Sequence, residues 1–439
     1  MKKFIPALVM MLFATIALFA GCASKTPTPN STDPVIGNGG LSVIKGDYIY
    51  YVNGYESNET TKSSHANKEG QVKVSSIYMA KIQNGELSDK RQLVSKVGGF
   101  EYSDLYIFGD KLYFLTPNTK KDDTGAIRSD IITLCSVQLD GSRLTEIFTP
   151  TQYSSGTFSM KEVNGKVYAF VFDGATISQI ELDNKNKVTQ ISADVTSFAT
   201  SRDKTCYSEN AQKTLDQSLD GYLFYSRSRN EQEGKNEDVG GNILERYNIA
   251  TGEKTILSSN INTTTKVTKV EGGRLFYTKG DSYYSMNSSF SSELRHTYVA
   301  VDGFTPLGKG ENGEELGIVI KYNSKLYLQK LTDSVIPSVA FSEDNVDIVA
   351  VDQDLIIVKD SNSKILSISS KDKSTITMFE PADEQKLGDK FDFDGRYLTL
   401  VGSVKDYNSN YSYIVDTFGA AGGQTSATQI GTVVDSDKK

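Results

Sequence analysis

Gly109-Asp110-Lys111-Leu112-Tyr113-Phe114 is the stretch that decides the fold, because the same phrase recurs along most of the chain. Each copy places a glycine or polar turn before a strand rich in aromatic and branched residues. Successive strong copies begin 63, 56, 56 and 52 residues apart, and a period of this length is typical of repeat architectures. The other strong copies are Gly46–Tyr51, Gly165–Phe170, Gly221–Tyr225 and Gly273–Tyr277, and weaker ones follow at Leu316–Lys321, Asp354–Lys359 and Gly395–Val401.

The residues after each copy continue as hairpins. In Leu134–Phe148, an alternating strand, an Asp-Gly turn and a third strand follow one another, which is the pattern of paired antiparallel strands. A short strand before each glycine completes four strands, the content of a propeller blade, and no long segment has helical periodicity. We therefore predict an all-β fold: a single β-propeller over residues 37–435, most simply with eight four-stranded blades. Seven blades are the alternative, because the units after Phe304 are irregular and residues 201–220 fit either a strand with a long loop or an insertion.

The N-terminus has the pattern of an export signal. Lys2 and Lys3 precede an apolar run from Phe4 to Ala20, too short for a typical membrane span. Leu18-Phe19-Ala20-Gly21-Cys22 resembles a lipobox, although Phe19 stands where that pattern usually has leucine. The resemblance implies a signal peptide at residues 1–21, lipidation of Cys22, a polar tether over residues 22–36 and a location on the outer face of a cell membrane. An ordinary secretory peptide and an uncleaved anchor helix are the alternatives.

The repeats also carry a family resemblance. Leu112–Thr116 followed by Leu139–Ser142 resembles the YWTD propellers of lipoprotein receptors, and the Gly-Asp-x-Leu-Tyr-Phe strands are similar to a domain of unknown function in Gram-positive surface lipoproteins. This implies a propeller at a Gram-positive cell surface and no particular activity. The chain has no tryptophan, so the recognition modes of the receptor family are not carried over. The same absence argues against WD repeats, sialidase Asp boxes and quinoprotein docking motifs.

The sequence offers few candidates for catalysis. Its only histidines are His65 and His296, and a zinc site or a catalytic triad is hard to build from two isolated histidines. The Gly308–Gly313 run matches Gly-x-Gly-x-x-Gly but precedes a strand-like segment, so we interpret it as a turn.

The cysteines and acid pairs give no clear site either. Cys135 and Cys206 could form one disulfide bridge, but buried thiols are the favoured interpretation. We expect no cofactor and no metal. The acid pairs Asp122-Asp123, Glu237-Asp238 and Asp392-x-Asp394 are interpreted as turns, with calcium binding or acid–base chemistry as alternatives.

Long insertions indicate a working face. Four long insertions, residues 54–74, 117–130, 229–241 and 403–410, each fall between the second and third strands of a unit, and such connections leave a propeller on one face.

The net charge of the chain limits the kind of partner. The formal charge of −8, or −10 once Lys2 and Lys3 are removed, disfavours binding to nucleic acid. We predict a non-enzymatic binding or scaffold module for a protein or an envelope glycan, with a carbohydrate-active glycosidase or lyase using funnel carboxylates as the alternative. The candidate binding residues are Tyr55, Asp122, Asp123, Arg128, Arg229, Glu237, Asp238, Tyr407 and Tyr411.

Overall fold

The computed structural model contains strands, turns and irregular segments in the part of the chain it describes. No helix among these residues is long and apolar enough to cross a membrane. The described residues are 27–53, 76–83, 86–94, 104–117, 123–125, 131–150, 157–201, 205–208, 211–214, 218–230, 241–260, 263–307, 317–352, 355–381, 385–404, 410–416 and 426–432.

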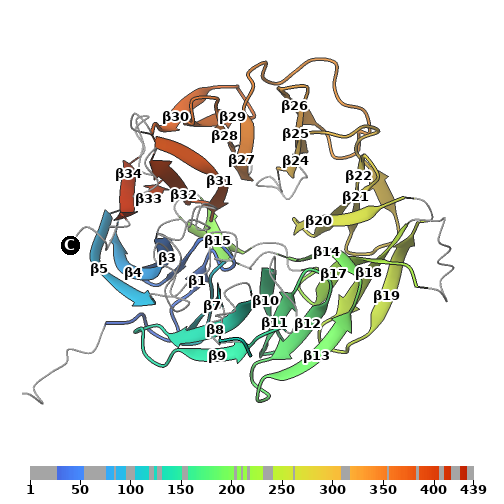
Figure 1. The fold of residues 1–439 in the computed structure, drawn as a ribbon. Coiled ribbons are helices and arrows are strands. Elements are labelled where there is room, and N and C mark those ends of the chain that lie inside the picture. Colours follow the sequence, from blue (N-terminus) through green and yellow to red (C-terminus); the bar gives the residue numbers. More distant parts are fainter. Residues whose placement is uncertain are drawn as a thin grey trace, which may run out of the picture.

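The strands form antiparallel sheets that follow one another around a ring (Figure 1). We number the sheets in chain order. Sheet 1 contains β1 (Val35–Ile36), β2 (Ser42–Lys45), β3 (Tyr48–Asn53), β4 (Ser76–Gln83) and β5 (Glu86–Val94). Sheet 2 contains β6 (Tyr106–Phe108), β7 (Lys111–Pro117), β8 (Ile132–Gln138) and β9 (Thr145–Phe148), and sheet 3 contains β10 (Thr157–Val163), β11 (Lys166–Phe172), β12 (Ile177–Glu181) and β13 (Lys187–Ser192).

The ring continues with sheets 4 to 8. Sheet 4 contains β14 (Val195–Thr200), β17 (Tyr222–Ser228), β18 (Asn242–Asn248) and β19 (Lys254–Ser259), and sheet 5 contains β20 (Thr265–Glu271), β21 (Arg274–Lys279), β22 (Ser282–Asn287) and β23 (Glu293–Arg295). Sheet 6 contains β24 (Gly303–Pro306), β25 (Ile318–Tyr322) and β26 (Lys325–Gln329). Sheet 7 contains β27 (Asp347–Asp352), β28 (Leu355–Lys359), β29 (Ile365–Ser369) and β30 (Thr375–Phe379), and sheet 8 contains β31 (Gln385–Phe393), β32 (Tyr397–Val404), β33 (Asn410–Asp416) and β34 (Ser426–Thr432).

This arrangement confirms the all-β class and the single propeller, and it corrects the prediction of eight four-stranded blades. Seven of the sheets are complete blades with four or five strands, whereas sheet 6 has three. In place of a fourth strand, sheet 6 has one isolated bridge between Leu326 and Ser342. The irregular sequence after Phe304 thus corresponds to one incomplete sheet.

Apolar side chains hold neighbouring sheets together. Alternate residues of a strand point to opposite faces, so the apolar second strands, such as β11 with the sequence KVYAFVF, bury side chains against the sheets on both sides. A separate buried cluster lies between each pair of neighbouring sheets; for example, Phe114 of β7 and Tyr50 of β3 share one cluster, and Tyr277 of β21 and Leu244 of β18 share another. The core is therefore divided into wedges between sheets.

Side-chain packing closes the ring between sheets 8 and 1. Neither sheet borrows a described strand from the other end of the chain. Tyr397 of β32 packs in one cluster with residues of β2 and β3, and the Ser42 and Thr399 hydroxyls lie 2.7 Å apart. Gly40 lies against Asp392, because a Cβ atom at position 40 would come within 1.8 Å of the Asp392 carboxylate.

Residues 201–220 are an insertion with a hairpin of its own. The hairpin pairs β15 (Thr205–Ser208) with β16 (Ala211–Thr214) and joins no other sheet. It lies between β14 and β17, the first two strands of sheet 4. The sequence fits either a strand with a long loop or an insertion here, and the structure shows an insertion.

Candidate functional site

The predicted loop positions are confirmed by the strand order. The connections after β3, β7, β17 and β32 each join the second and third strands of a complete blade, not counting the extra strand β1 of sheet 1. In an antiparallel blade these connections lie at the end opposite to those between first and second strands. We call the two ends of the ring the loop face and the turn face.

Most of the predicted binding residues lie outside the described residues, namely Tyr55, Asp122, Arg128, Glu237, Asp238 and Tyr407. Of the rest, Asp123 is exposed in a turn. Arg229 follows β17, and its Nη1 donates a hydrogen bond to Ser259 Oγ at 2.6 Å. Tyr411 lies in β33, where its backbone is paired with Gly402 and Thr432. These three residues come from sheets 2, 4 and 8.

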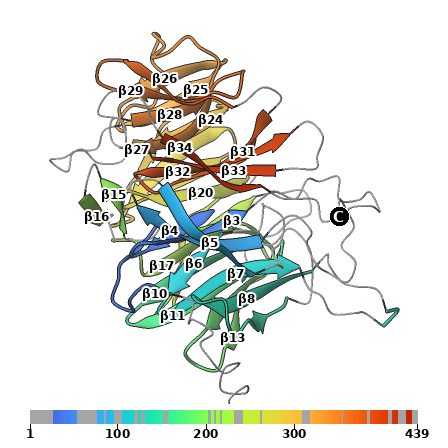
Figure 2. The ribbon, with the colours of Figure 1, turned by 90° about the vertical axis from the view of Figure 1, so that its left-hand side faces the viewer.

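The N-terminal segment enters from the turn face. Val35 of β1 is paired with Lys45, the last residue of β2, and β2 leads directly into a first-to-second turn. The hairpin β15–β16 also leaves from a first-to-second connection, and Figure 2 shows it at the left edge of the ring. The N-terminal segment and the four long connections therefore leave the ring at opposite ends.

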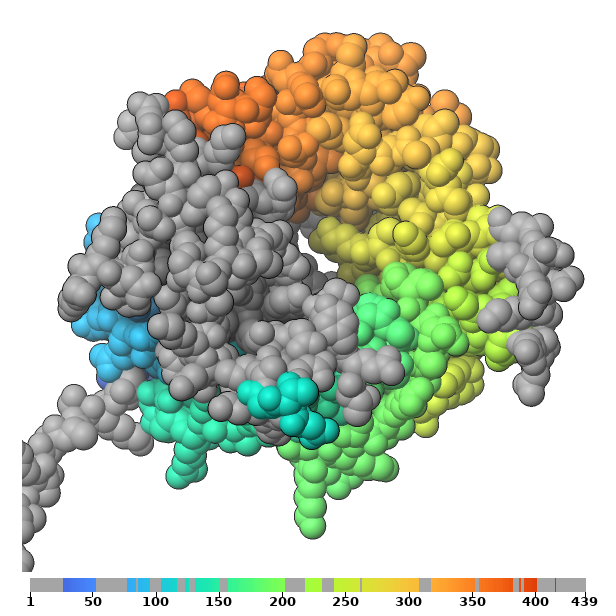
Figure 3. Space-filling view, in the orientation of Figure 1, coloured from blue at the N-terminus to red at the C-terminus, as the bar shows by residue number. Residues whose placement is uncertain are grey.

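A hollow of about 280 Å³ lies on the inner wall of the ring and is lined by β10, β14, β20, Tyr106 and residues 38–39. We call it the central hollow. The space-filling view of the ring also shows an opening near its middle, beside the first strands of sheets 4 and 5 (Figure 3). These first strands are the innermost of their sheets, so the ring itself creates the hollow.

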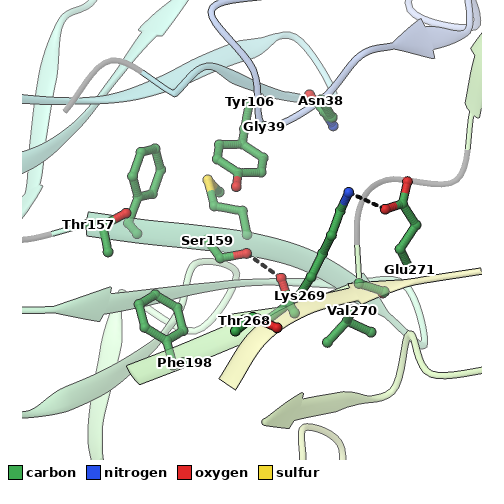
Figure 4. A pocket seen from close by; sticks show the side chains of 15 residues that line it. Asn38, Gly39, Tyr106, Thr157, Ser159, Phe198, Thr268, Lys269, Val270 and Glu271 are labelled. Carbon is green, nitrogen blue, oxygen red and sulfur yellow. Dashed lines mark hydrogen bonds and ion pairs between the residues drawn. The ribbon is translucent and has the colours of Figure 1, made fainter. Parts of the chain in front are cut away.

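Hydroxyl groups from several strands line the central hollow (Figure 4). Ser159 Oγ of β10 and Thr200 Oγ1 of β14 are 2.5 Å apart and connect sheets 3 and 4. Thr268 lies at a β-bulge, because the pairing of β20 with β21 skips from Val267 to Lys269. A bulge redirects a side chain from its strand alternation, and Thr268 is exposed on the wall of the hollow.

Charge in the central hollow is balanced. Its only charged lining residues among those described are Lys269 and Glu271, which form an ion pair with each other (Figure 4). The aromatic rings of Tyr106 and Phe158 meet edge to face, with centroids 5.0 Å apart, and add an apolar wall. The hollow thus presents hydroxyls and aromatic rings with no net charge.

A second hollow of about 270 Å³ shares Asn38 and Met160 with the first and is lined in part by the N-terminal segment. Lys45 is 2% exposed, and its Nζ donates to the carbonyl oxygens of Gly109 at 2.7 Å and Ser31 at 3.2 Å. Burial lowers the pKa of Lys45 from its usual value, and Asp33 and Asp110 oppose that change. Lys161 Nζ is also buried and lies 3.2 Å from Asp220 Oδ1. These lysines connect Ser31 to β2 and Asp220 to β10.

His296 belongs to the core between sheets 5 and 6. It is 0% exposed, and its Nε2 lies 2.9 Å from Ser285 Oγ. Burial lowers the pKa of His296 to about 4, with a smaller contribution from Arg274. A neutral, enclosed imidazole of this kind has a packing role. His65 and Gly308–Gly313 lie outside the described residues.

The described acid pair has a structural place in the fold. Asp394 Oδ1 accepts hydrogen bonds from the backbone N–H groups of Arg396 at 3.0 Å and Tyr397 at 2.8 Å, forming the turn before β32. Within the described residues, no group of three or more His, Cys, Asp or Glu side chains could hold a metal ion. Cys135 is a buried thiol in β8, whereas the side chain of Cys206 lies outside the described part.

The sequence analysis named the propeller funnel as an alternative site but missed the residues that line the central hollow. Its residues come from the weak first strands, which have no glycine signature and alternate hydroxyl with apolar side chains, as in TFSMKEV of β10 and VTSFAT of β14. The signal was present as repeated serine and threonine in these strands. Only closure of the ring, however, places them around one space.

No protein-family model matches this chain, and no curated protein matches its sequence significantly. Solved propellers are similar in fold at a distance. The C-terminal WD40 domain of Sif2 matches with a TM-score of 0.44 and 8% identity, over 75% of this chain and 84% of that one. A putative 6-phosphogluconolactonase from Bacteroides uniformis matches with a TM-score of 0.41 and 13% identity, over 89% and 98% of the two chains. A chain of the nidogen/laminin complex matches with a TM-score of 0.30 and 8% identity, over 76% and 94%.

Proposed function

We propose that this protein is a lipid-anchored, extracytoplasmic binding module that captures a protein or an envelope glycan with its loop face. The observation that carries the proposal is the separation of the two ends of the ring. The N-terminal segment leaves at the turn face, while the four long second-to-third connections leave at the loop face. A chain anchored through Cys22 would thus direct its longest connections away from the membrane.

The tether and the loops have compositions that suit these roles. Residues 22–30, which precede the part held against the ring, are polar and contain two prolines, and nine residues fully extended span about 30 Å. That reach lifts the ring clear of lipid headgroups. The inserted loops are rich in Ser, Asn, Lys, Glu and Gly, side chains that suit wet, polar contacts.

Glycoside cleavage, the second candidate, has less support. It requires two carboxylates flanking the sugar bond, whereas the described lining of the central hollow has one, Glu271, which is ion-paired with Lys269. The separation of faces therefore favours binding.

Two sets of variants test the proposal. Cys22→Ala should move the protein from the membrane fraction to the soluble fraction; retention on membranes would contradict the lipid anchor. Deleting residues 118–130 and 231–240 should abolish pull-down of envelope components by the full chain while changing its melting temperature little. Deleting residues 205–214 at the turn face is the matched control, and unchanged pull-down after the loop deletions would contradict the loop face as the binding surface.

A further inference from the structure

The geometry points to a second binding site in this protein: the central hollow takes a neutral saccharide of one or two rings. This inference concerns the inner wall of the ring and does not depend on the anchor or on the loop face. The volume of about 280 Å³ lies at the lower end of the range for small-molecule sites. It is too small for a folded partner and sufficient for a short sugar.

The hydrogen-bonding groups on the wall match a polyhydroxyl ligand. Thr268 is exposed on the wall of the hollow, so its hydroxyl can bond to a ligand there. The hydroxyls of Ser159 and Thr200 bond to each other, but each can take part in further hydrogen bonds because a hydroxyl both donates and accepts. The innermost strands β10, β14 and β20 also present backbone groups along an edge with which no described strand pairs. A sugar has donors and acceptors on every side and can use all three kinds of group.

The apolar part of the wall fits the same ligand. Tyr106 is held between Phe108, 6.5 Å away in a stacked arrangement, and Phe158, 5.0 Å away edge to face. Its hydroxyl lies against Gly39, where a Cβ atom would come within 2.9 Å. Tyr106 and Phe158 are buried and fix the shape of the wall, while Phe198, which is partly exposed, gives the hollow an apolar side that suits a ligand with one apolar face.

The charges on the wall of the central hollow should discriminate between neutral and charged sugars. Among the described lining residues the only cation and the only carboxylate, Lys269 and Glu271, are paired with each other, so a charged sugar would have to compete for them. Burying an unpaired charge there would be costly. The structure therefore favours neutral saccharides over their charged relatives.

The test is titration of the detergent-solubilised full chain with maltose, cellobiose, lactose and N,N′-diacetylchitobiose, followed by saturation-transfer NMR and calorimetry. Digalacturonate and glucosamine serve as charged comparators. We expect at least one neutral sugar to bind in the millimolar range or tighter, and the charged sugars to bind at least tenfold more weakly. Failure of all four neutral sugars to bind, or stronger binding of a charged sugar, would overturn the inference.

Variants locate the site. Thr200→Val should weaken binding at least tenfold, and Thr268→Phe should abolish it by filling the hollow. Thr133→Val is the matched control, since the Thr133 hydroxyl also bonds to another hydroxyl, that of Thr149 at 2.9 Å, but lies outside the hollow. Equal effects of Thr200→Val and Thr133→Val would overturn the location.

Two further arms complete the test. Binding of an alternating Val-Thr hexapeptide in preference to every sugar would overturn the class of ligand, because such a peptide could pair with the open strand edge. Deleting residues 118–130 and 231–240 should leave sugar affinity unchanged. Loss of partner capture with retained sugar binding would thus separate the loop-face proposal from this one.

Discussion

Single buried residues carry consequences that the sequence does not display, and His296 is an example. Its pKa is lowered to about 4 from 6.5 because the ring is enclosed. The unfolded chain therefore takes up a proton first as the pH falls. Stability should decline between about pH 6.5 and pH 4, by up to roughly 3 kcal/mol from this group.

The variant His296→Gln isolates that contribution, because glutamine can still bond to Ser285 without titrating in this range. Urea unfolding at pH 7, 6 and 5 should show a smaller loss of stability in the variant than in the wild type. Carboxylates contribute equally to both proteins, so the difference between them is the relevant quantity. Parallel pH profiles would contradict the assignment of a neutral, buried imidazole.

The burial of His296 depends on residues of neighbouring strands. The sequence showed only that His296 is one of two histidines in the chain. It could not indicate the burial, because the enclosing residues Phe276 and Phe304 come from neighbouring sheets. The turn at Asp394 and Gly395 was predictable, since Asp-Gly sequences favour turns.

Neighbouring strands are also held together by charge: sheet 4 contains a buried ion pair between its second and third strands. Arg227 and Glu245 face each other with two hydrogen bonds, from Nη2 to Oε1 at 2.8 Å and from Nε to Oε2 at 3.1 Å. Their side chains are 13% and 6% exposed. Each charge of such a buried, bidentate pair is compensated only while the other partner is present.

We expect Arg227→Met or Glu245→Leu alone to lower the free energy of unfolding by about 3–5 kcal/mol, because each leaves an unpaired buried charge. The double variant should recover most of that loss, since it removes both charges. Chemical denaturation of the four proteins gives the coupling energy. If the effects of the two single variants simply add in the double variant, the pair is not coupled in this way.

Strand pairing was also where the sequence was most informative. The Asp-Gly turn within Leu134–Phe148 predicted the hairpin of β8 and β9, the glycine at the start of Gly165–Phe170 predicted the turn between β10 and β11, and the structure has both. Sheet 6 was harder, because its outer strand is reduced to a single bridge at Ser342 and has no repeated phrase.

The ring as a whole depends on how sheet 8 meets sheet 1. Gly40→Ala should lower the free energy of unfolding by about 1–3 kcal/mol, because the added methyl group would meet the Asp392 carboxylate. Gly221→Ala is the matched control, since nothing lies within 4 Å of a Cβ atom there. Thermal denaturation of both variants measures the difference, and equal melting temperatures would show that the seam tolerates the added volume.

The sequence by itself determined the strand class, the repeat, the position of the long loops within each blade and an export-signal pattern at the N-terminus. These are local properties, set by side-chain alternation, turn residues and composition over a few tens of positions. Only the tertiary structure decided that sheet 6 is incomplete, that Gly40 meets Asp392 and that hydroxyls of β10, β14 and β20 surround one hollow. Those features depend on contacts between residues far apart in the chain, which form when the ring closes.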